Sequence, residues 1–340
     1  MKKVVTAQHV AKQAGVSPTT VSFVMNNVLS ANISEATRER VLQVAQDLGY
    51  VPHALAKSLA KGRSDNIGLF LVQPHPQVFA DPYIPNIMSG IRQAIQADGF
   101  RILVEQLRTT ADVGLMLTTL KSGEIAGAIV TQNIWNPQQL KQLQNYPVVC
   151  LAPVDNSQIS YTAIDHLQGI KELAQHIKHL DRLPIAVITY ASLELKHVQR
   201  RLHAFHETLT ELGTTVDDHH IREGAYHPDS GYNAMESLIK DYPNIQAVYC
   251  MNDMMAVGAL SYLNQHHINV PDDIAVVGYD DIRVSAFLNP PLTTVRAPEV
   301  MLGESAGDLL LKLINGQTPD QTQQLLPTQL VIRQSCGTKT

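Results

Sequence analysis

The sequence predicts a small N-terminal all-α domain of the helix-turn-helix type, followed by a larger α/β body of two lobes with parallel sheets. Three observations indicate this fold class. A glycine, a serine and a proline separate two helical segments in "AGVSPTTVSFVMNN", short apolar runs alternate with amphipathic segments from Ile67 onward, and basic residues concentrate near the N-terminus. With 340 residues, the chain is long enough for one small and one large domain.

The first helix is predicted within "VTAQHVAKQAGV", because apolar residues recur there at helical spacing. Val10, Ala11 and Ala14 would face inward, and Thr6 can cap the N-terminus of the helix. Gly15 suits the left-handed position at which such a helix ends.

The second helix is predicted to begin at Pro18, after a tight turn. Ser17 is a favoured N-cap residue, and the missing N–H of a proline costs nothing at the first helical position. Val21 and Val24 lie three residues apart and can both face the interior.

A third helix is predicted in "NISEATRERVLQVAQDLGY", with Ser34 as its cap and Gly49 at its end. Val41, Ala45 and Leu48 form the expected buried stripe. Helix, short turn with glycine, helix and third helix together indicate a helix-turn-helix module. An ordinary three-helix subdomain without a role in nucleic-acid binding would give the same pattern.

The distribution of charge favours nucleic acid as the partner of this head. The first 63 residues hold three acidic residues and eight basic ones, namely Lys2, Lys3, Lys12, Arg38, Arg40, Lys57, Lys61 and Arg63. Since the whole chain has 26 basic and 31 acidic residues, the remainder carries 18 basic against 28 acidic. A basic head on an acidic body is expected when only the head contacts phosphate.

Composition limits the class of protein further. Cys150, Cys250 and Cys336 lie far apart and form no CxxC pair, which indicates a reducing compartment rather than a disulfide scaffold. No apolar run approaches the length that spans a membrane, and the first ten residues lack the apolar core of a signal peptide. We therefore expect a cytoplasmic protein with no membrane partner.

The body is predicted to contain parallel sheets covered by helices on both faces. Buried strands are expected in "IGLFLV", "FRILVE", "AGAIVT", "PVVCLA", "PIAVIT", "AVYCM" and "IAVVGY". Helical segments such as "RRLHAFHETLTELG" lie between these runs. The units are too many for one core, so two lobes are expected, with a ligand at the carboxyl ends of the strands.

Polar and aromatic residues follow several of the predicted strands. They are Tyr83, Arg201, Tyr226, Asn252, Asp253, Asp280 and Asp281. Aromatic faces together with carboxylates, an amide and a guanidinium suit a small polyhydroxylated or heterocyclic ligand. Taken singly, Asp253 could instead cap the next helix and Tyr226 could pack in the core.

Enzymatic function has no positive support in the sequence. The chain contains none of the motifs GxxxxGK[ST], GxSxG, HExxH or, after a strand, GxGxxG. The 14 histidines are scattered, and the pairs at residues 219–220 and 266–267 fall in polar segments typical of solvated loops. We expect no catalytic residue, no metal and no cofactor.

The quoted segments, taken together, resemble the lactose-repressor family of bacterial regulators. The head resembles the DNA-binding module of that family, and "VPDDIAVVGYDD" and "PPLTTVRAPEVMLGESA" resemble its body segments in the expected order. This resemblance implies a periplasmic-binding-protein-like body whose chain crosses between the lobes more than once. It divides the chain into a DNA-binding domain at 1–50, a hinge helix and linker at 51–64, and an effector-binding and dimerisation domain at 65–340.

The resemblance also implies which residues contact DNA. Pro18, Thr19 and Phe23 match the positions that read bases in the major groove. The residues placed for phosphates or for helix capping are Thr6, Ser17, Thr20, Ser22 and Asn26. Phe23 departs from the family, in which arginine is commonest here, and it offers only an apolar contact, for instance to a thymine methyl. It could also shield the core of the head.

The segment "VPHALAKSLAKG" matches the hinge of the family. Such a short helix is marginal in water, so it is expected to order only against a second subunit over the DNA minor groove. Leu59 matches the wedge residue of the family, which inserts between base pairs. Lys57 lies beside it and is placed to contact the DNA backbone. A plain linker is the alternative.

In the body, the resemblance implies five effector contacts. They are Tyr83, Arg201, Tyr226, Asn252 and Asp280. Tyr226 corresponds to an aromatic residue that stacks on the ligand, whereas Arg201 and Asp280 correspond to polar anchors. Asp165 lies near a matching segment but is expected to cap the helix that follows it.

We therefore predict a transcriptional repressor that binds double-stranded operator DNA as a homodimer and is controlled by a small-molecule effector. The effector is expected to be a sugar, with a nucleobase or nucleoside as the alternative. A cytoplasmic sugar-binding or sugar-modifying protein without an operator, and an activator rather than a repressor, also fit the residues. Whether the effector releases or promotes DNA binding is left open by the sequence.

Overall fold

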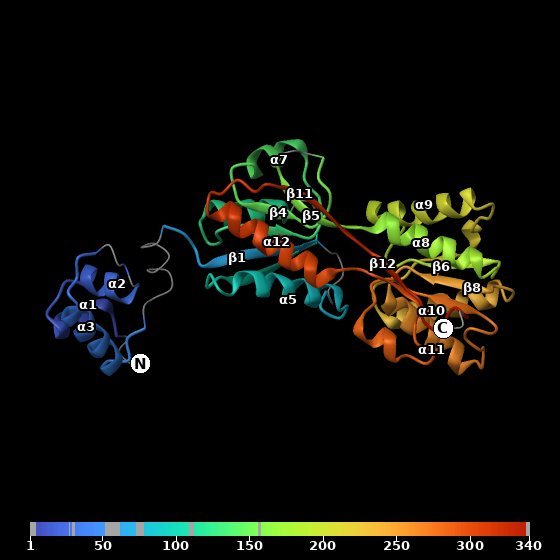
Figure 1. The fold of residues 1–340 in the computed structure, drawn as a ribbon, viewed down its shortest axis with the longest axis horizontal. Helices are drawn as coiled ribbons and strands as arrows, with labels where there is room; N and C mark the ends of the chain where they lie inside the picture. The colour runs from blue at the N-terminus through green and yellow to red at the C-terminus, as the bar shows by residue number, and fades with distance from the viewer. Residues whose placement is uncertain are drawn as a thin grey trace.

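The computed structural model describes residues 5–26, 28, 31–51, 62–72, 78–108, 112–155 and 158–337. These residues form a helical head and a body of two α/β lobes (Figure 1). We call the lobe that follows the head the N-lobe and the other the C-lobe. The predicted contacts of Lys57 and Leu59 remain predictions, because both residues lie outside the described ranges.

The head consists of α1 (Ala7–Ala14), α2 (Pro18–Met25) and α3 (Glu35–Asp47). Its predicted helix ends are confirmed. The hydroxyl of Ser17 accepts a hydrogen bond from the backbone N–H of Thr20 at 3.0 Å, and Ser34 accepts one from Thr37 at 3.3 Å. Gly15 ends α1 with a left-handed φ of 66°, a conformation that glycine adopts without strain.

The inward faces predicted for the three helices are also confirmed. The core of the head is formed by Val10, Ala11, Ala14, Val21, Val24, Val41 and Ala45, with Leu48 packed at its edge. The guanidinium of Arg40 donates from Nε to the carbonyl of Ala14 at 3.0 Å. This bond satisfies a carbonyl at the end of α1 and ties α3 to the first helix.

The N-lobe contains a parallel six-stranded sheet in the order β11-β5-β4-β3-β1-β2. Its strands are β1 (Asn66–Val72), β2 (Arg101–Leu107), β3 (Ala128–Val130), β4 (Val148–Cys150), β5 (Ser160–Asp165) and β11 (Gln323–Pro327). Its helices are α5 (Tyr83–Ile95), α6 (Val113–Lys121), α7 (Pro137–Leu143) and α12 (Glu299–Ile314). Alternate residues of β1 are buried on the two faces: Leu69 lies in the cluster with α5 and α12, and Phe70 in the cluster with α6 and α7.

The C-lobe repeats this architecture with a parallel four-stranded sheet in the order β7-β6-β8-β9. Its strands are β6 (Ile185–Ile188), β7 (Ile221–Arg222), β8 (Ala247–Cys250) and β9 (Ala275–Val277). Its helices are α8 (His166–His179), α9 (Lys196–Glu211), α10 (Pro228–Asp241) and α11 (Asp253–Gln265), with short 3₁₀ turns η2 (Asp218–His220) and η3 (Arg283–Phe287). An antiparallel pair, β10 (Thr294–Arg296) and β12 (Gln329–Val331), completes the lobe.

All seven apolar runs predicted as strands are strands in the structure. The strands β5, β7, β10, β11 and β12 were not predicted, because they are short, partly polar or hydrogen-bonded only to one neighbour. Four of them, namely β5, β10, β11 and β12, border the segments that join the lobes.

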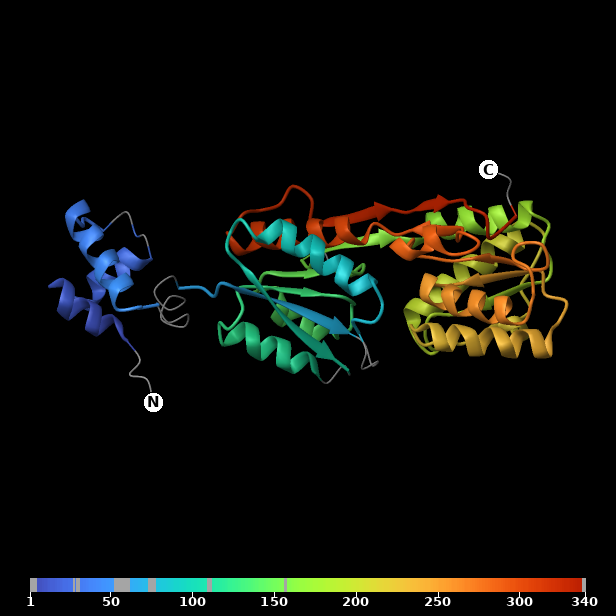
Figure 2. The same cartoon turned by 90° about the horizontal axis from the view of Figure 1, so that it is seen from below.

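The chain crosses between the lobes three times. It leaves the N-lobe between β5 and α8, returns between β10 and α12, and leaves again between β11 and β12 (Figures 1 and 2). The predicted body of two lobes with repeated crossings is therefore observed. Three backbone segments therefore join the lobes, and they can serve as hinges for a movement of one lobe relative to the other.

Helices α5 and α12 of the N-lobe approach so closely that their contact requires glycines. A Cβ atom added to Gly90 would overlap the carbonyl oxygen of Val300, and one added to Gly303 would overlap that of Ile87. The glycines allow the two helix backbones to touch across this face of the sheet. In the C-lobe, Gly258 of α11 plays the corresponding role against Pro228.

Gly90→Ala is therefore expected to destabilise the body, because the rigid backbone of α12 cannot yield to the new methyl group. Overpacking of this kind costs about 1–3 kcal/mol, which exceeds the roughly 1 kcal/mol that alanine gains over glycine in a helix. The melting temperature measured by differential scanning calorimetry should fall by a few degrees. Gly114→Ala in α6 is the control, since nothing lies within 4 Å of its added Cβ; an equal fall for both variants would contradict the close-packing argument.

Candidate functional site

The exposed face of α2 is the first candidate site. Ser17, Pro18, Thr19 and Phe23 are exposed, whereas Val21 and Val24 on the opposite side are buried in the head. Thr19 and Phe23 lie four residues apart and so share one face of the helix. Pro18, Thr19 and Phe23 are the residues predicted to reach base edges, and Ser17 is predicted for phosphate or helix capping.

Phe23 is 40% exposed and is not part of the core of the head. The described core of the head therefore gives no support to the alternative that its ring shields this core. The exposed ring is accessible for the apolar contact with DNA that the resemblance implies, and this contact remains a prediction.

The other predicted DNA residues have local roles that the structure shows. The amide of Asn26 donates to the carbonyl of Ser22 at 2.9 Å and lies 3.3 Å from its hydroxyl. Thr6 pairs with His9 at the start of α1, where its backbone N–H donates to Nδ1 at 3.1 Å. These residues cap the helices, and their contacts with phosphate remain predictions.

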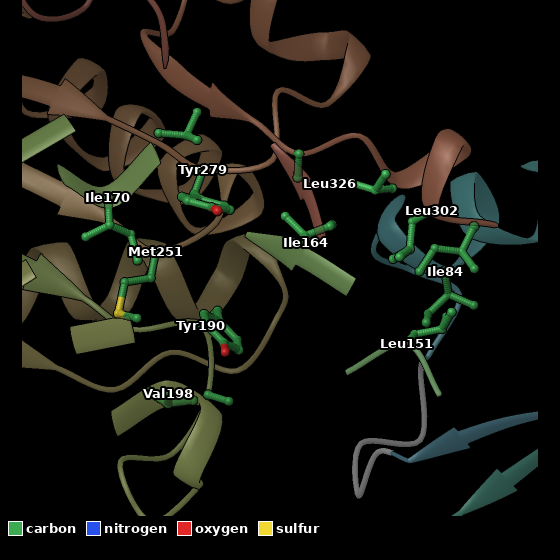
Figure 3. Close-up of a cluster of buried hydrophobic side chains, with 14 of the residues drawn as sticks. Ile84, Leu151, Ile164, Ile170, Tyr190, Val198, Met251, Tyr279, Leu302 and Leu326 are labelled. Atoms are coloured by element: carbon green, nitrogen blue, oxygen red, sulfur yellow. The ribbon is translucent and has the colours of Figure 1, made fainter. Parts of the chain in front are cut away.

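The second candidate site lies between the lobes, at the carboxyl ends of the C-lobe strands. Tyr190 follows β6, Tyr226 follows β7, Met251 and Asn252 follow β8, and Asp280 follows β9. Figure 3 shows Tyr190 and Tyr279 on the C-lobe, facing Ile84, Leu151 and Leu302 of the N-lobe, with Ile164 and Leu326 on the crossing segments.

Arg201 lies at the centre of this site, as predicted from its position in α9. Its guanidinium carbon lies 4.7 Å from the ring centroid of Tyr190 and 4.3 Å from that of Tyr279. It also donates to the carbonyl of Met251 at 2.9 Å. The two cation–π contacts and this hydrogen bond fix the guanidinium in place, so it is a pre-oriented donor.

Tyr226 lies beside this arginine and adopts a left-handed backbone conformation with φ of 63°. Its ring centroid is 5.5 Å from that of Tyr190, and the two planes are tilted by 54°. Burial raises the pKa of the Tyr226 hydroxyl, so this group remains a neutral donor. A strained backbone that holds an aromatic ring in a site is a feature of ligand-binding positions.

Three carboxylates complete the site. Asp81 precedes α5, Glu299 begins α12, and Asp280 has a φ of 110°. Burial raises the pKa of Asp280 well above its ordinary value, and the neighbouring Glu299 and Asp81 raise it further. Burial likewise raises the pKa of Glu299 to about 8. These acids bind protons more readily than free carboxylates until a ligand satisfies them.

Asn252 joins the two lobes directly. Its Oδ1 accepts from the N–H of Met255 at 2.9 Å and so caps α11, while its Nδ2 donates to Asp81 at 3.1 Å. Its predicted contact with effector remains a prediction, and the bond to Asp81 is a role that the sequence did not indicate.

Asp253 and Asp281 have structural roles. The carboxylate of Asp253 accepts from the hydroxyls of Ser285 and Thr294, both at 2.6 Å, and does not cap α11. Asp281 pairs with Arg296 at 2.7 Å and Arg333 at 2.6 Å. The predicted capping role of Asp165 is confirmed, since it accepts from Leu167 at 3.1 Å.

Several residues of the site were not predicted from the sequence. They are Asp81, His166, Tyr190, Tyr249, Tyr279 and Glu299. Tyr190 follows the predicted strand "PIAVIT", so the rule that found Asn252 could have found it, whereas Tyr279 is the last residue of the predicted strand "IAVVGY". Glu299 begins a helix and gave no such signal, because only the return of the chain to the N-lobe brings it near Asp280.

Within the described ranges, no group of three or more histidine, cysteine or acidic residues is arranged to hold a metal ion. Cys150, Cys250 and Cys336 are buried, and the Sγ atom of Cys336 lies 3.1 Å from the hydroxyl of Thr293. No helix in the same ranges is long and apolar enough to cross a membrane.

A helix-turn-helix head on a two-lobed α/β body with a site between the lobes defines a ligand-responsive DNA-binding regulator. Residues 6–53 match the model of the bacterial regulatory proteins of the lacI family, and residues 174–336 match a periplasmic binding protein-like domain. The chain is 31% identical to the HTH-type transcriptional regulator CelR of Thermobifida fusca, over 97% of this chain and 98% of that protein. The chain belongs to the lacI family of bacterial transcriptional regulators.

Further relatives and structures agree. Catabolite control protein A of Priestia megaterium is 29% identical over 97% of this chain and 99% of its own. The lac repressor dimer bound to operator and the anti-inducer ONPF has a TM-score of 0.84 at 28% identity, covering 98% of this chain and 99% of that one. A complex of CelR with cellobiose has a TM-score of 0.70 at 30% identity, covering 97% and 99%.

Proposed function

We propose that this regulator is a dimeric, cytoplasmic repressor that binds operator DNA through α2 and is controlled by a sugar bound between the lobes. The observation that carries this proposal is the site around Arg201. Two tyrosine rings hold the guanidinium, the charge of Asp280 acts on it, and Asp81 and Glu299 of the N-lobe act in turn on Asp280. Fixed donors and acceptors beside aromatic faces suit the hydroxyls and the C–H faces of a sugar ring.

The relatives support a sugar and a dimer. CelR forms a complex with cellobiose, a family regulator of Lactobacillus casei binds sucrose at 26% identity, and the lac repressor binds its operator as a dimer. A dimer would place two copies of α2 on two half-sites of a near-palindromic operator.

The control would act through the crossing segments. Because Asp81 and Glu299 belong to the N-lobe and Asn252 and Asp280 to the C-lobe, a ligand that touches both lobes favours one arrangement of them. This arrangement sets the spacing of the two heads, so operator affinity changes with occupancy. The proposal includes no catalytic role for the residues of the site between the lobes.

A nucleobase or nucleoside is the second candidate effector of the proposal. Several relatives are HTH-type transcriptional repressors named PurR, for example that of Aliivibrio salmonicida at 29% identity. The tyrosine rings around Arg201 could stack on a planar base as well as on a sugar.

The proposal is tested by selection of DNA fragments with the full chain, followed by fluorescence anisotropy with and without cellobiose, sucrose and purine bases. We expect a near-palindromic sequence to be selected, and a sugar to change its affinity about fivefold or more. Selection of fragments without a common sequence would contradict the proposal that the protein binds a specific operator. A response to a purine base alone would show that the effector is a nucleobase and not a sugar.

A further inference from the structure

The hydrogen bond between Asn252 and Asp81 joins the two lobes at a point outside the crossing segments. The amide Nδ2 of Asn252 donates to Oδ2 of Asp81 at 3.1 Å, and the two residues are only 3% and 8% exposed. A buried bond from an amide to a carboxylate is stronger than a bond between neutral groups, because water does not compete for it. Separation of the lobes therefore has to break a bond that is costly to lose.

A second hydrogen bond fixes each of these two side chains. Oδ1 of Asp81 accepts from the backbone N–H of Tyr83 at 2.9 Å, at the start of α5. Oδ1 of Asn252 accepts from the backbone N–H of Met255 at 2.9 Å and caps α11. The amide of Asn252 cannot turn over without losing this cap, so its N–H groups must face Asp81. The bond thus connects the N-termini of two helices, one from each lobe.

Both helices are held firmly within their own lobes. α5 touches α12 so closely that a Cβ atom on Gly90 would overlap the carbonyl oxygen of Val300. α11 touches α10 in the same way, since a Cβ atom on Gly258 would overlap the carbonyl oxygen of Pro228. Because such close backbones leave no room for independent sliding, each partner of the bond moves with its whole lobe.

The bond also lies beside the site around Arg201. The carbonyl of Met251, the residue before Asn252, accepts from the guanidinium at 2.9 Å. A ligand that contacts Arg201 therefore meets the same end of β8 that carries Asn252. Occupancy of the site and integrity of the bond depend on the same arrangement of the lobes.

We propose that Asp81 and Asn252 form a latch that holds the lobes together without effector and sets the fraction of the protein that is ready to bind it. The link to the effector rests on the proposed function, whereas the latch concerns the protein alone. A ligand that touches both lobes selects the latched arrangement. Its apparent affinity rises with the fraction of the protein that already has this arrangement.

Loss of the latch should also change the operator affinity of the unliganded protein. The change should have the opposite direction to the change that the effector causes, because latch and effector favour the same arrangement of the lobes. This sign holds whether the effector releases or promotes DNA binding.

Three variants test the latch. Asp81→Asn keeps an oxygen for the N–H of Tyr83 but turns a second amide donor toward Asn252. Asn252→Asp keeps the cap of α11 but sets two carboxylates against each other. Each single variant should lose the bond between the lobes. The double variant, with both substitutions, restores one donor and one acceptor, with the direction of the bond reversed and both caps retained.

The measurement is amide hydrogen exchange of the unliganded full chain, read by mass spectrometry. At the starts of α5 and α11, we expect exchange to be about tenfold faster in each single variant and close to the wild-type rate in the double variant. Asp217→Asn and Asn136→Asp are the matched controls, because each residue accepts a backbone N–H at 2.9 Å within its own lobe. They should leave exchange at both helix starts unchanged.

Wild-type exchange in both single variants, or a double variant that exchanges as fast as the single ones, would overturn the latch. Calorimetry of Asp81→Asn with cellobiose, sucrose and purine bases tests the link to the effector. The compound that changes operator affinity should bind this variant about threefold to tenfold more weakly than the wild-type protein. An unchanged Kd would overturn the link. If none of these compounds changes operator affinity, the proposed control by effector is contradicted, and the exchange rates still decide on the latch.

Discussion

Replacing Asp280 by alanine is expected to abolish the response to effector while leaving operator affinity nearly unchanged. The carboxylate of Asp280 forms no hydrogen bond with the described residues, and the charges of Glu299, Asp81 and Arg201 act on it. A ligand that donates to it loses a hydrogen bond to a charged group, which corresponds to a roughly tenfold to hundredfold higher Kd. Tyr226→Ala should act in the same direction by removing the ring beside Arg201.

Asp281→Ala is the matched control, because the two aspartates are adjacent but differ in their partners. Asp281 holds Arg296 and the largely buried Arg333, so its loss should lower the melting temperature and leave the Kd of the effector unchanged. The Kd is measured by calorimetry on each variant, and operator release by anisotropy. Normal effector response in both Asp280→Ala and Tyr226→Ala would place the ligand elsewhere.

Local chemistry made the head predictable from its sequence. Ser17, Pro18 and Ser34 act on backbone groups within three residues, so a short window contains all the information that sets the helix ends. The three-residue spacing of Val21 and Val24 was sufficient to predict the buried face of α2, because it also lies within a short window of sequence. The seven apolar runs of the body identified strands equally well, but they could not give the strand order.

The site between the lobes was only partly predictable. Residues directly after a strand, such as Asp280, were found because all strand ends of a parallel sheet meet at one edge. Glu299 was missed, because its place depends on a crossing segment that returns α12 to the first lobe. The bond of Asn252 to Asp81 joins residues 171 positions apart, and no local pattern contains that distance.

Operator binding is expected to weaken about a thousandfold between roughly 50 and 200 mM salt, if the dimer neutralises at least six phosphates. The basic residues of the head supply this positive charge. Arg63 is an exception, because it contacts the body: its guanidinium donates to Asn315 at 2.9 Å and lies 5.4 Å from the ring centroid of Phe100. Fluorescence anisotropy on a selected operator gives the slope of log affinity against log salt.

Lys12→Gln tests the origin of this slope. Lys12 is exposed in the last turn of α1, the helix that crosses the DNA backbone in helix-turn-helix complexes, so its removal should lower the slope by about one per subunit. Lys240→Gln is the control, because α10 belongs to the C-lobe, which is connected to the head only through the N-lobe (Figure 1). It should leave the slope unchanged. Operator affinity that is independent of salt, or an equal loss of slope in both variants, would show that the head does not bind DNA through phosphate.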